Sequence, residues 1–219
     1  MHPACVAALV VCGVLLAVPI LSVVVFFSVC ACTRTSPWGF DPRYVAMLLR
    51  IHLFGGKVDR GKLRDNLEAF ADVLSRRGMK FWLETGTALG AIREGDIIEG
   101  DCDVDVGLRA EDRDRFHDEV LPDLVAAGFS VGKPEPLTLF RDQHYIDIEF
   151  LGRGLPCHAI QWPNLCDDHM DTIEPLQQAR IGSRTYSAPS TAYLVRLYGE
   201  DWRVPKANFK PTDTRQPYR

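Results

Sequence analysis

An uncharged, apolar stretch at the N-terminus divides this chain of 219 residues into two parts. The stretch covers residues 4–32, and a helix of that length, at about 1.5 Å per residue, exceeds the roughly 30 Å hydrocarbon core of a bilayer. A cleavable signal peptide is the alternative interpretation, but its apolar core usually has only about 7–15 residues. We therefore predict a transmembrane anchor in residues 1–33 and one globular domain after it.

The net charge bears on binding of nucleic acid, and the cysteines bear on zinc binding and disulfide formation. The formal net charge is −4, so the chain has no electrostatic footprint for nucleic acid, and we expect none as a partner. No cysteines form the paired CxxC motif of a zinc site. Cys157 and Cys166 leave two alternatives open, a disulfide or two free thiols.

Residues 34–58 predict a linker with a short helix at residues 44–54, and residues 59–219 predict the folded domain. Asp59 is a suitable N-cap and Gly78 a suitable C′ residue for a helix between them. The pattern beyond it predicts a mixed α/β (α+β) fold with a central mixed sheet. Its further elements are a strand at 79–83, a helix at 88–93, a strand at 103–106, a helix at 110–127 that Pro122 interrupts, strands at 137–140 and 144–151, a hairpin around Gly182, and a helix between Ser190 and Gly199.

Acidic residues alternate with apolar ones on two of these strands. Asp103 and Asp105 alternate with valines, which places both carboxylates on one face of a strand. Asp147 lies in a similar strand and offers a third carboxylate, with Glu149 as the alternative. Carboxylate oxygens suit Mg²⁺ or Mn²⁺. We therefore predict a metal site of Asp103, Asp105 and Asp147, of the kind that serves phosphoryl and nucleotidyl transfer.

A possible phosphate-binding element precedes the acids. Gly86 and Thr87 stand between a predicted strand and a predicted helix, where backbone N–H groups can bind phosphate oxygens. Arg93 adds a bidentate phosphate donor. Each pattern alone also occurs as a solvated strand face or an ordinary turn, but the combination is typical of the nucleotidyltransferase fold.

Two segments make the pattern more specific. Residues 82–93 (Trp-Leu-Glu-Thr-Gly-Thr-Ala-Leu-Gly-Ala-Ile-Arg) and 101–106 (Asp-Cys-Asp-Val-Asp-Val) resemble the signature of the LicD/fukutin family. Residues 193–205 resemble the closing element of that family, Leu…Tyr-Gly-x-Asp-Trp-x-x-Pro. The resemblance covers roughly residues 59–205 and departs from the family pattern at Cys102, which replaces an acidic residue.

The resemblance implies a nucleotidyltransferase-like fold and a metal-dependent reaction. A phosphorylated alcohol, such as phosphocholine or ribitol phosphate, would pass from a CDP-linked donor to a glycan, and CMP would leave. By the same resemblance Asp103, Asp105 and Asp147 would bind the metal, while Asp101 would lie behind them or accept a proton. The donor phosphates would be held by Gly86, Thr87 and Arg93.

Three questions stay open at this stage. Strand alternation predicts that the Cys102 side chain points away from Asp101 and Asp103, yet its presence also permits an inactive, membrane-tethered glycan-binding module. Transfer of NMP from an NTP is a second enzymatic alternative. The few basic residues after the apolar stretch favour a cytoplasmic domain, whereas the resemblance implies a single-pass protein with a lumenal Golgi or ER domain. We adopt the lumenal placement, which glycosylation of a sequon engineered after Arg34 would test.

Overall fold

The computed structural model describes residues 41–53, 58–134, 136–153 and 169–205. Among these residues no helix is both long and apolar enough to cross a bilayer. The predicted anchor in residues 1–33 lies outside the described residues, as do Cys157 and Cys166. The membrane anchor and the lumenal placement therefore stay predictions, and both alternatives for Cys157 and Cys166 remain.

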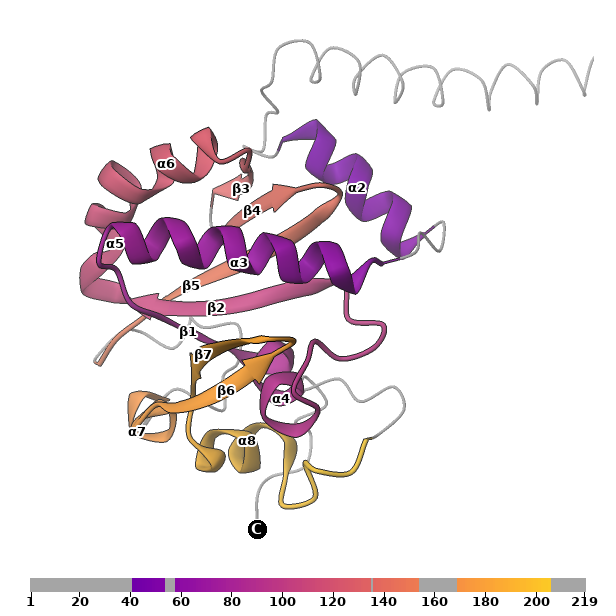
Figure 1. Ribbon diagram of the computed structural model, residues 1–219, viewed down its shortest axis with the longest axis vertical. Helices are drawn as coiled ribbons and strands as arrows, with labels where there is room; N and C mark the ends of the chain where they lie inside the picture. Colours follow the sequence, from indigo (N-terminus) through magenta and orange to yellow (C-terminus); the bar gives the residue numbers. More distant parts are fainter. Residues whose placement is uncertain (1–40, 54–57, 135, 154–168, 206–219) are drawn as a thin grey trace, which may run out of the picture.

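The described residues form a mixed α/β fold around a five-stranded sheet (Figure 1). The strand order is β1-β2-β5-β4-β3, with β2 and β5 parallel and the other neighbours antiparallel, so the predicted central mixed sheet is confirmed. A separate hairpin is formed by β6 and β7. In chain order the elements are α2 (Pro42–His52), α3 (Arg60–Arg76), β1 (Phe81–Leu83), α4 (Thr85–Arg93), β2 (Asp103–Arg109), the 3-10 turn η1 (Ala110–Asp112), α5 (Arg113–Arg115), the π-helical turn η2 (Phe116–Val120), α6 (Leu121–Ala126), β3 (Ser130–Pro134), β4 (Leu137–Arg141), β5 (His144–Leu151), α7 (His169–Ile173), β6 (Gln177–Ile181), β7 (Arg184–Ala188) and α8 (Thr191–Tyr198).

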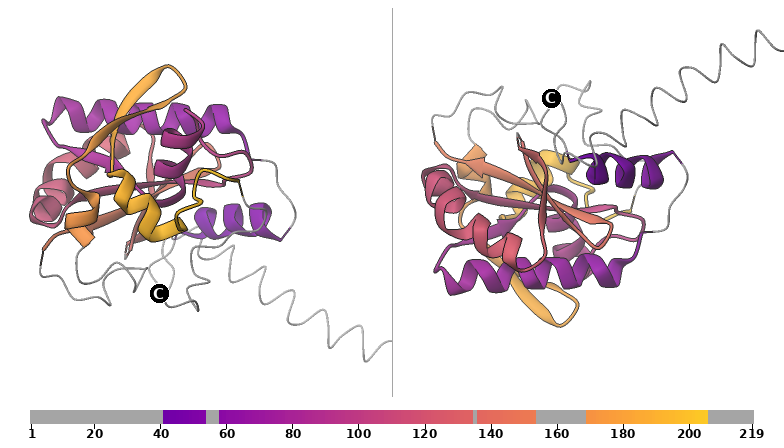
Figure 2. Two further views of the ribbon diagram at one scale, coloured as in Figure 1. Left: turned by 90° about the horizontal axis from the view of Figure 1, so that it is seen from below. Right: turned by 90° about the horizontal axis from the view of Figure 1, so that it is seen from above.

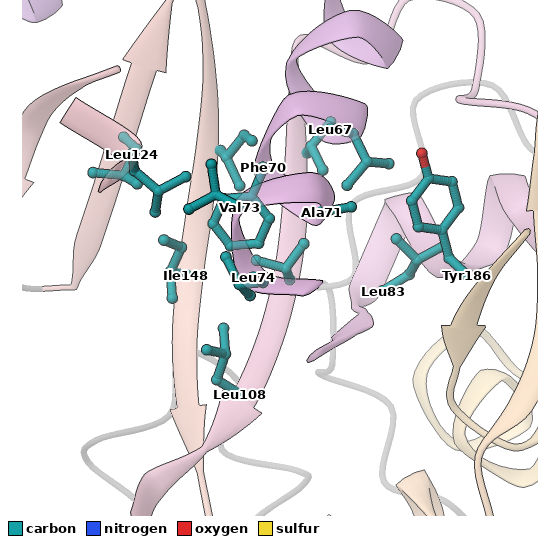
Figure 3. Close-up of a cluster of buried hydrophobic side chains, with 14 of the residues drawn as sticks. Leu67, Phe70, Ala71, Val73, Leu74, Leu83, Leu108, Leu124, Ile148 and Tyr186 are labelled. Atoms are coloured by element: carbon teal, nitrogen blue, oxygen red, sulfur yellow. The ribbon is translucent and has the colours of Figure 1, made fainter. Parts of the chain in front are cut away.

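The main core lies between α3 and one face of the sheet. Leu67, Phe70 and Leu74 of α3 are fully buried and pack with side chains such as Leu108 and Ile148 of the central strands (Figure 3). Both predicted ends of α3 are confirmed. The Asp59 carboxylate accepts a hydrogen bond from the Gly61 N–H at 2.8 Å, and Gly78 follows the helix with φ of 63°.

Helix α2 lies on the other side of the sheet from α3 (Figure 2). Tyr44 and Met47 are buried and pack with Phe140 and Tyr145. Gly132 permits this contact, since a Cβ there would lie 2.6 Å from the Tyr44 ring. The short helix expected in the linker is therefore present and is packed onto the sheet. It begins at Pro42, before the predicted residue 44.

The predicted helix at residues 110–127 is a series of short helical turns. A π-helical turn, η2, directly precedes α6, in which Pro122 stands near the start. Proline has no N–H to donate to the preceding turn, which accounts for the predicted interruption.

The hairpin between β4 and β5 turns at Asp142 and Gln143, with φ of 51° and 65°, as a tight two-residue turn requires.

The hairpin around Gly182 and the last helix are also confirmed. Gly182 and Gly199 have φ of 60° and 88°, and α8 follows Ser190 as its N-cap. The Ser190 hydroxyl, however, donates to the Thr172 carbonyl at 2.6 Å rather than capping the helix. Hairpin β6–β7, α4 and α8 lie together below the sheet in Figure 1.

Candidate metal centre

The predicted alternation on β2 is confirmed. Val104 and Val106 are fully buried in the core with α3, whereas Asp103 and Asp105 occupy the opposite face. In the parallel pairing of β2 with β5, Asp105 lies directly beside Asp147. Two neighbouring strands thus bring the three predicted carboxylates to one place.

One carboxylate oxygen each from Asp103, Asp105 and Asp147 lies within 4.8 Å of the others. Two hydroxyls hold these carboxylates, because Thr85 donates to Asp105 Oδ2 and Thr138 donates to Asp147 Oδ1. Three convergent carboxylate oxygens fit a hard divalent cation such as Mg²⁺ or Mn²⁺.

Burial and repulsion between neighbouring carboxylates raise the pKa of several acids around the centre. Burial, followed by the charge of Asp103, raises the pKa of Asp105 well above its usual value, and burial also raises the pKa of Asp147. Burial raises the pKa of Asp101 and of Glu149 to about 7, with Asp103 and Asp147 respectively adding to the effect. A bound cation would offset this repulsion.

Lys133 is a positive charge close to the acids, and no sequence pattern indicated its role. It pairs with Thr138 across β3 and β4, and Thr138 pairs with Asp147 across β4 and β5. Partners in an antiparallel ladder point to the same face. The charge of Lys133 accordingly offsets part of the burial-driven increase in the pKa of both Asp147 and Glu149.

Helix α4 begins at Thr85, three positions before the predicted start at residue 88. Gly86 and Thr87 therefore lie in the first helical turn, whose N–H groups lack intrahelical partners. The Thr87 side chain is fully buried, and its Oγ1 accepts from the Asp105 N–H at 2.9 Å. The Thr87 hydroxyl thus links α4 to β2. The groups in this turn that would bind a phosphate are the backbone N–H groups of Gly86 and Thr87.

Arg93 lies at the opposite end of α4, about 10 Å along the helix from Gly86 at 1.5 Å per residue. Its guanidinium forms an ion pair with Glu94 at 2.5 Å and donates to the Trp202 carbonyl at 3.4 Å. The structure does not bring Arg93 to the first turn of α4. A phosphate bound by Arg93 would compete with Glu94.

The predicted orientation of Cys102 is wrong. Strand β2 begins only at Asp103, so the alternation does not extend to Cys102. Its Sγ and one carboxylate oxygen each of Asp101 and Asp103 lie within 4.8 Å of one another. Burial, followed by the charge of Asp103, raises the pKa of the Cys102 thiol to about 11. The side chain therefore stays a neutral thiol beside the acids and 3.6 Å from the Tyr145 hydroxyl.

Glu84 is a buried acid beside the centre to which the sequence analysis assigned no role. Its side chain accepts hydrogen bonds from Trp82 Nε1 and from the Tyr193 hydroxyl. Only 1% of Glu84 is exposed, and burial raises its pKa to about 8, with a further increase from Glu149. One signal was present in the sequence, because Glu84 directly follows the apolar run of β1.

Comparison with known proteins supports the resemblance to the LicD/fukutin family. Residues 78–148 match the family model described as LicD/FKTN/FKRP, nucleotidyltransferase domain. The chain is similar to the human ribitol 5-phosphate transferase FKRP, with 48% identity over 50 residues, which are 23% of this chain and 10% of that protein. Its similarity to the mouse ribitol-5-phosphate transferase FKTN is 29% over 97 residues, which are 44% of this chain and 20% of that protein.

The alignments therefore span at most a fifth of the length of these two relatives. Among solved structures, the antibiotic-resistance factor ANT(2'')-Ia aligns with a TM-score of 0.46 and 15% identity, over 69% of this chain and 78% of that one. The segment that matches the family model contains Asp101, Asp103, Asp105 and Asp147. Residues 78–148 thus carry the match to the family of LicD/FKTN/FKRP nucleotidyltransferase domains.

Proposed function

We propose that this protein is a metal-dependent transferase of a phosphorylated alcohol, of the ribitol phosphate or phosphocholine type. The donor is a CDP-linked alcohol, the acceptor is a glycan, and CMP is released. The observation that carries the proposal is the convergence of Asp103, Asp105 and Asp147 within 4.8 Å, inside the segment that matches the family model. The names of the relatives FKRP and FKTN support ribitol phosphate as a transferred group.

The residues around the centre suit this reaction. Asp103, Asp105 and Asp147 would hold Mg²⁺ or Mn²⁺, which when bound neutralises charge on the phosphates. The first turn of α4 presents its N–H groups beside Asp101, and Lys133 places a positive charge beside Asp147. Asp101, with a pKa of about 7, is suited to accept the proton of the attacking acceptor hydroxyl.

The test measures which product leaves. The full chain, purified in detergent, is incubated with CDP-ribitol, CDP-choline or CDP-glycerol in Mg²⁺ or Mn²⁺, with and without a panel of glycans. We expect slow CMP release that a suitable glycan accelerates and that EDTA abolishes. Pyrophosphate release from an NTP, with no turnover of any CDP-alcohol, would instead establish NMP transfer. A folded protein that turns over neither donor class would be the inactive glycan-binding module.

Isosteric variants connect this activity to the acids. Asp103→Asn and Asp105→Asn should each lower kcat at least about a hundredfold without loss of folding, because a metal ligand is lost and no cavity is created. Asp118→Asn, at an exposed position of the π-helical turn η2, is the matched control and should retain activity. Metal-dependent turnover that survives both changes would exclude the acids from the reaction.

A further inference from the structure

The first residue of α4 has an unfavourable backbone conformation. Thr85 has φ of 41°, in the left-handed region, where β-branched residues are rarely found. Such a conformation persists only when the surrounding structure holds it in place. Thr85 is also buried, with 7% of its surface exposed. Neighbouring groups must therefore hold Thr85 in this conformation.

A chain of buried hydrogen bonds holds Thr85 from the side of α8. The Thr85 N–H donates to the Tyr193 hydroxyl oxygen at 3.2 Å, and the Tyr193 hydroxyl donates to Glu84 Oε2. The other carboxylate oxygen of Glu84 accepts from Trp82 Nε1. Tyr193, Glu84 and Trp82 are each at most 2% exposed. The Glu84 carboxylate thus receives two donors in a site closed to water.

A second set of bonds leads from the same turn to Asp105. The Thr85 hydroxyl donates to Asp105 Oδ2. The backbone of Asp105 is held as well, since its N–H donates to Thr87 Oγ1 at 2.9 Å and its carbonyl accepts from the Glu84 N–H at 3.0 Å. Residues 84–87 therefore fix both the position of Asp105 on β2 and the rotation of its carboxylate.

We propose that Glu84 and Tyr193 are positioning residues for the metal centre, holding Thr85 in the conformation from which its hydroxyl orients the Asp105 carboxylate toward Asp103 and Asp147. This inference rests on the proposed function, because it takes these three acids as the metal ligands. It also gives a role to α8, because Tyr193 belongs to that helix. Helix α8 lies outside the segment that matches the family model. Groups that orient a ligand in this way commonly change metal affinity 10–100-fold when removed.

The experiment separates the Thr85 hydroxyl from the Thr85 backbone. Mn²⁺ affinity, measured by electron paramagnetic resonance of the full chain, should fall about tenfold in Thr85→Ala, because the donor to Asp105 is lost. Thr85→Ser keeps the donor and should restore most of that affinity. Thr85→Gly relieves the unfavourable φ without restoring the donor, so it should bind Mn²⁺ as weakly as Thr85→Ala while unfolding at a temperature no lower.

Tyr193→Phe and Glu84→Gln test the more distant partners. Tyr193→Phe removes the acceptor of the Thr85 N–H but keeps the ring, and Glu84→Gln replaces one acceptor oxygen with a donor. Both should weaken Mn²⁺ binding and lower kcat for CMP release more than they raise KM for the CDP-alcohol. If Thr85→Ala, Tyr193→Phe and Glu84→Gln unfold at lower temperature but bind Mn²⁺ like the wild type, their role is structural and the inference is wrong.

The two proposals fail in different ways. If the wild type binds Mn²⁺ but turns over no CDP-alcohol, the proposed function is wrong, and the Mn²⁺ affinities of the variants still decide the positioning inference. If the wild type binds no Mn²⁺, both are overturned. Asp105→Asn, which removes a metal ligand, serves as the reference variant. The Mn²⁺ affinity of Thr85→Ala should lie between the affinities of the wild type and of Asp105→Asn.

Discussion

Gly86 is the residue of α4 that lies directly against Asp101. A Cβ at this position would lie 3.0 Å from Asp101 Oδ2, a contact so tight that the carboxylate would have to move by a few tenths of an ångström. Gly86 lies in a helix, where alanine is normally favoured over glycine by about 0.5–1 kcal/mol. An added methyl group should therefore stabilise the helix while it displaces the Asp101 carboxylate.

We expect Gly86→Ala to leave the melting temperature unchanged or slightly raised and to lower kcat for CMP release by roughly tenfold, because Asp101 is displaced. Thermal unfolding and product release are measured on the same preparation. Asp101→Asn and the double variant complete a mutant cycle, in which the two losses should not be additive. A variant that is less stable yet fully active would contradict this account of Gly86.

The success of prediction from the sequence differed among the residues of the centre. Strand alternation placed Asp103, Asp105 and Asp147 correctly, because it depends only on the local backbone. The same rule failed for Cys102, which lies one position before β2 begins. The contacts of Thr85 could not be predicted, since its hydrogen-bond partner Tyr193 is 108 positions away in the chain.

Among the elements, α3 has a predicted N-cap that can be tested apart from the centre. The Asp59 carboxylate accepts from the N–H groups of Gly61 and Lys62. Asp59→Ala should lower the free energy of unfolding by about 1 kcal/mol, whereas Asp59→Asn keeps an acceptor and should cost only a few tenths. Both variants should retain CMP release, because α3 packs on the face of the sheet opposite Asp103 and Asp105. Equal stability of the two in urea unfolding would exclude the cap as a stabilising contact.

Local signals decided which elements could be predicted. Helix α3 has apolar periodicity and a residue of the expected type at each end, and hairpin β4–β5 has a two-residue turn. Strand β3 was missed because it contains Gly132 and Pro134 and its pairing shifts between Val131 and Lys133, so its sequence does not alternate. The short helix α7 was also missed, and α4 was predicted to start too late because Thr85 and Gly86 are characteristic of turns.

At the scale of the whole molecule, acids from strands β2 and β5 and from the connections beside them meet on one side of the sheet. Burial is the first cause of the raised pKa of each of five acids in this region. The pKa of Glu84 is raised to about 8, those of Asp101 and Glu149 to about 7, and those of Asp105 and Asp147 also lie above the usual range. Folding and proton binding are therefore coupled through this part of the molecule.

The sign of that coupling gives a prediction for the metal-free protein. A carboxyl group whose pKa is raised on folding binds its proton more tightly in the folded state, so its contribution to stability is lost as the pH rises from about 4.5 through its folded pKa. The melting temperature in EDTA should therefore fall between pH 6 and pH 8.5. Glu84 alone, with a pKa of 4.5 raised to about 8, accounts for at most about 3 kcal/mol of the loss above pH 6. Glu84→Gln should make the fall shallower.

Mn²⁺ should reverse the trend, because a metal binds the ionised carboxylates and displaces their protons. The increase in melting temperature produced by saturating Mn²⁺ should thus be larger at pH 8 than at pH 6, as measured by differential scanning fluorimetry. Asp105→Asn is the control and should abolish most of the increase at both values. A metal-induced increase independent of pH, or a melting temperature in EDTA that rises with pH, would show that these acids are not protonated in the folded, metal-free protein.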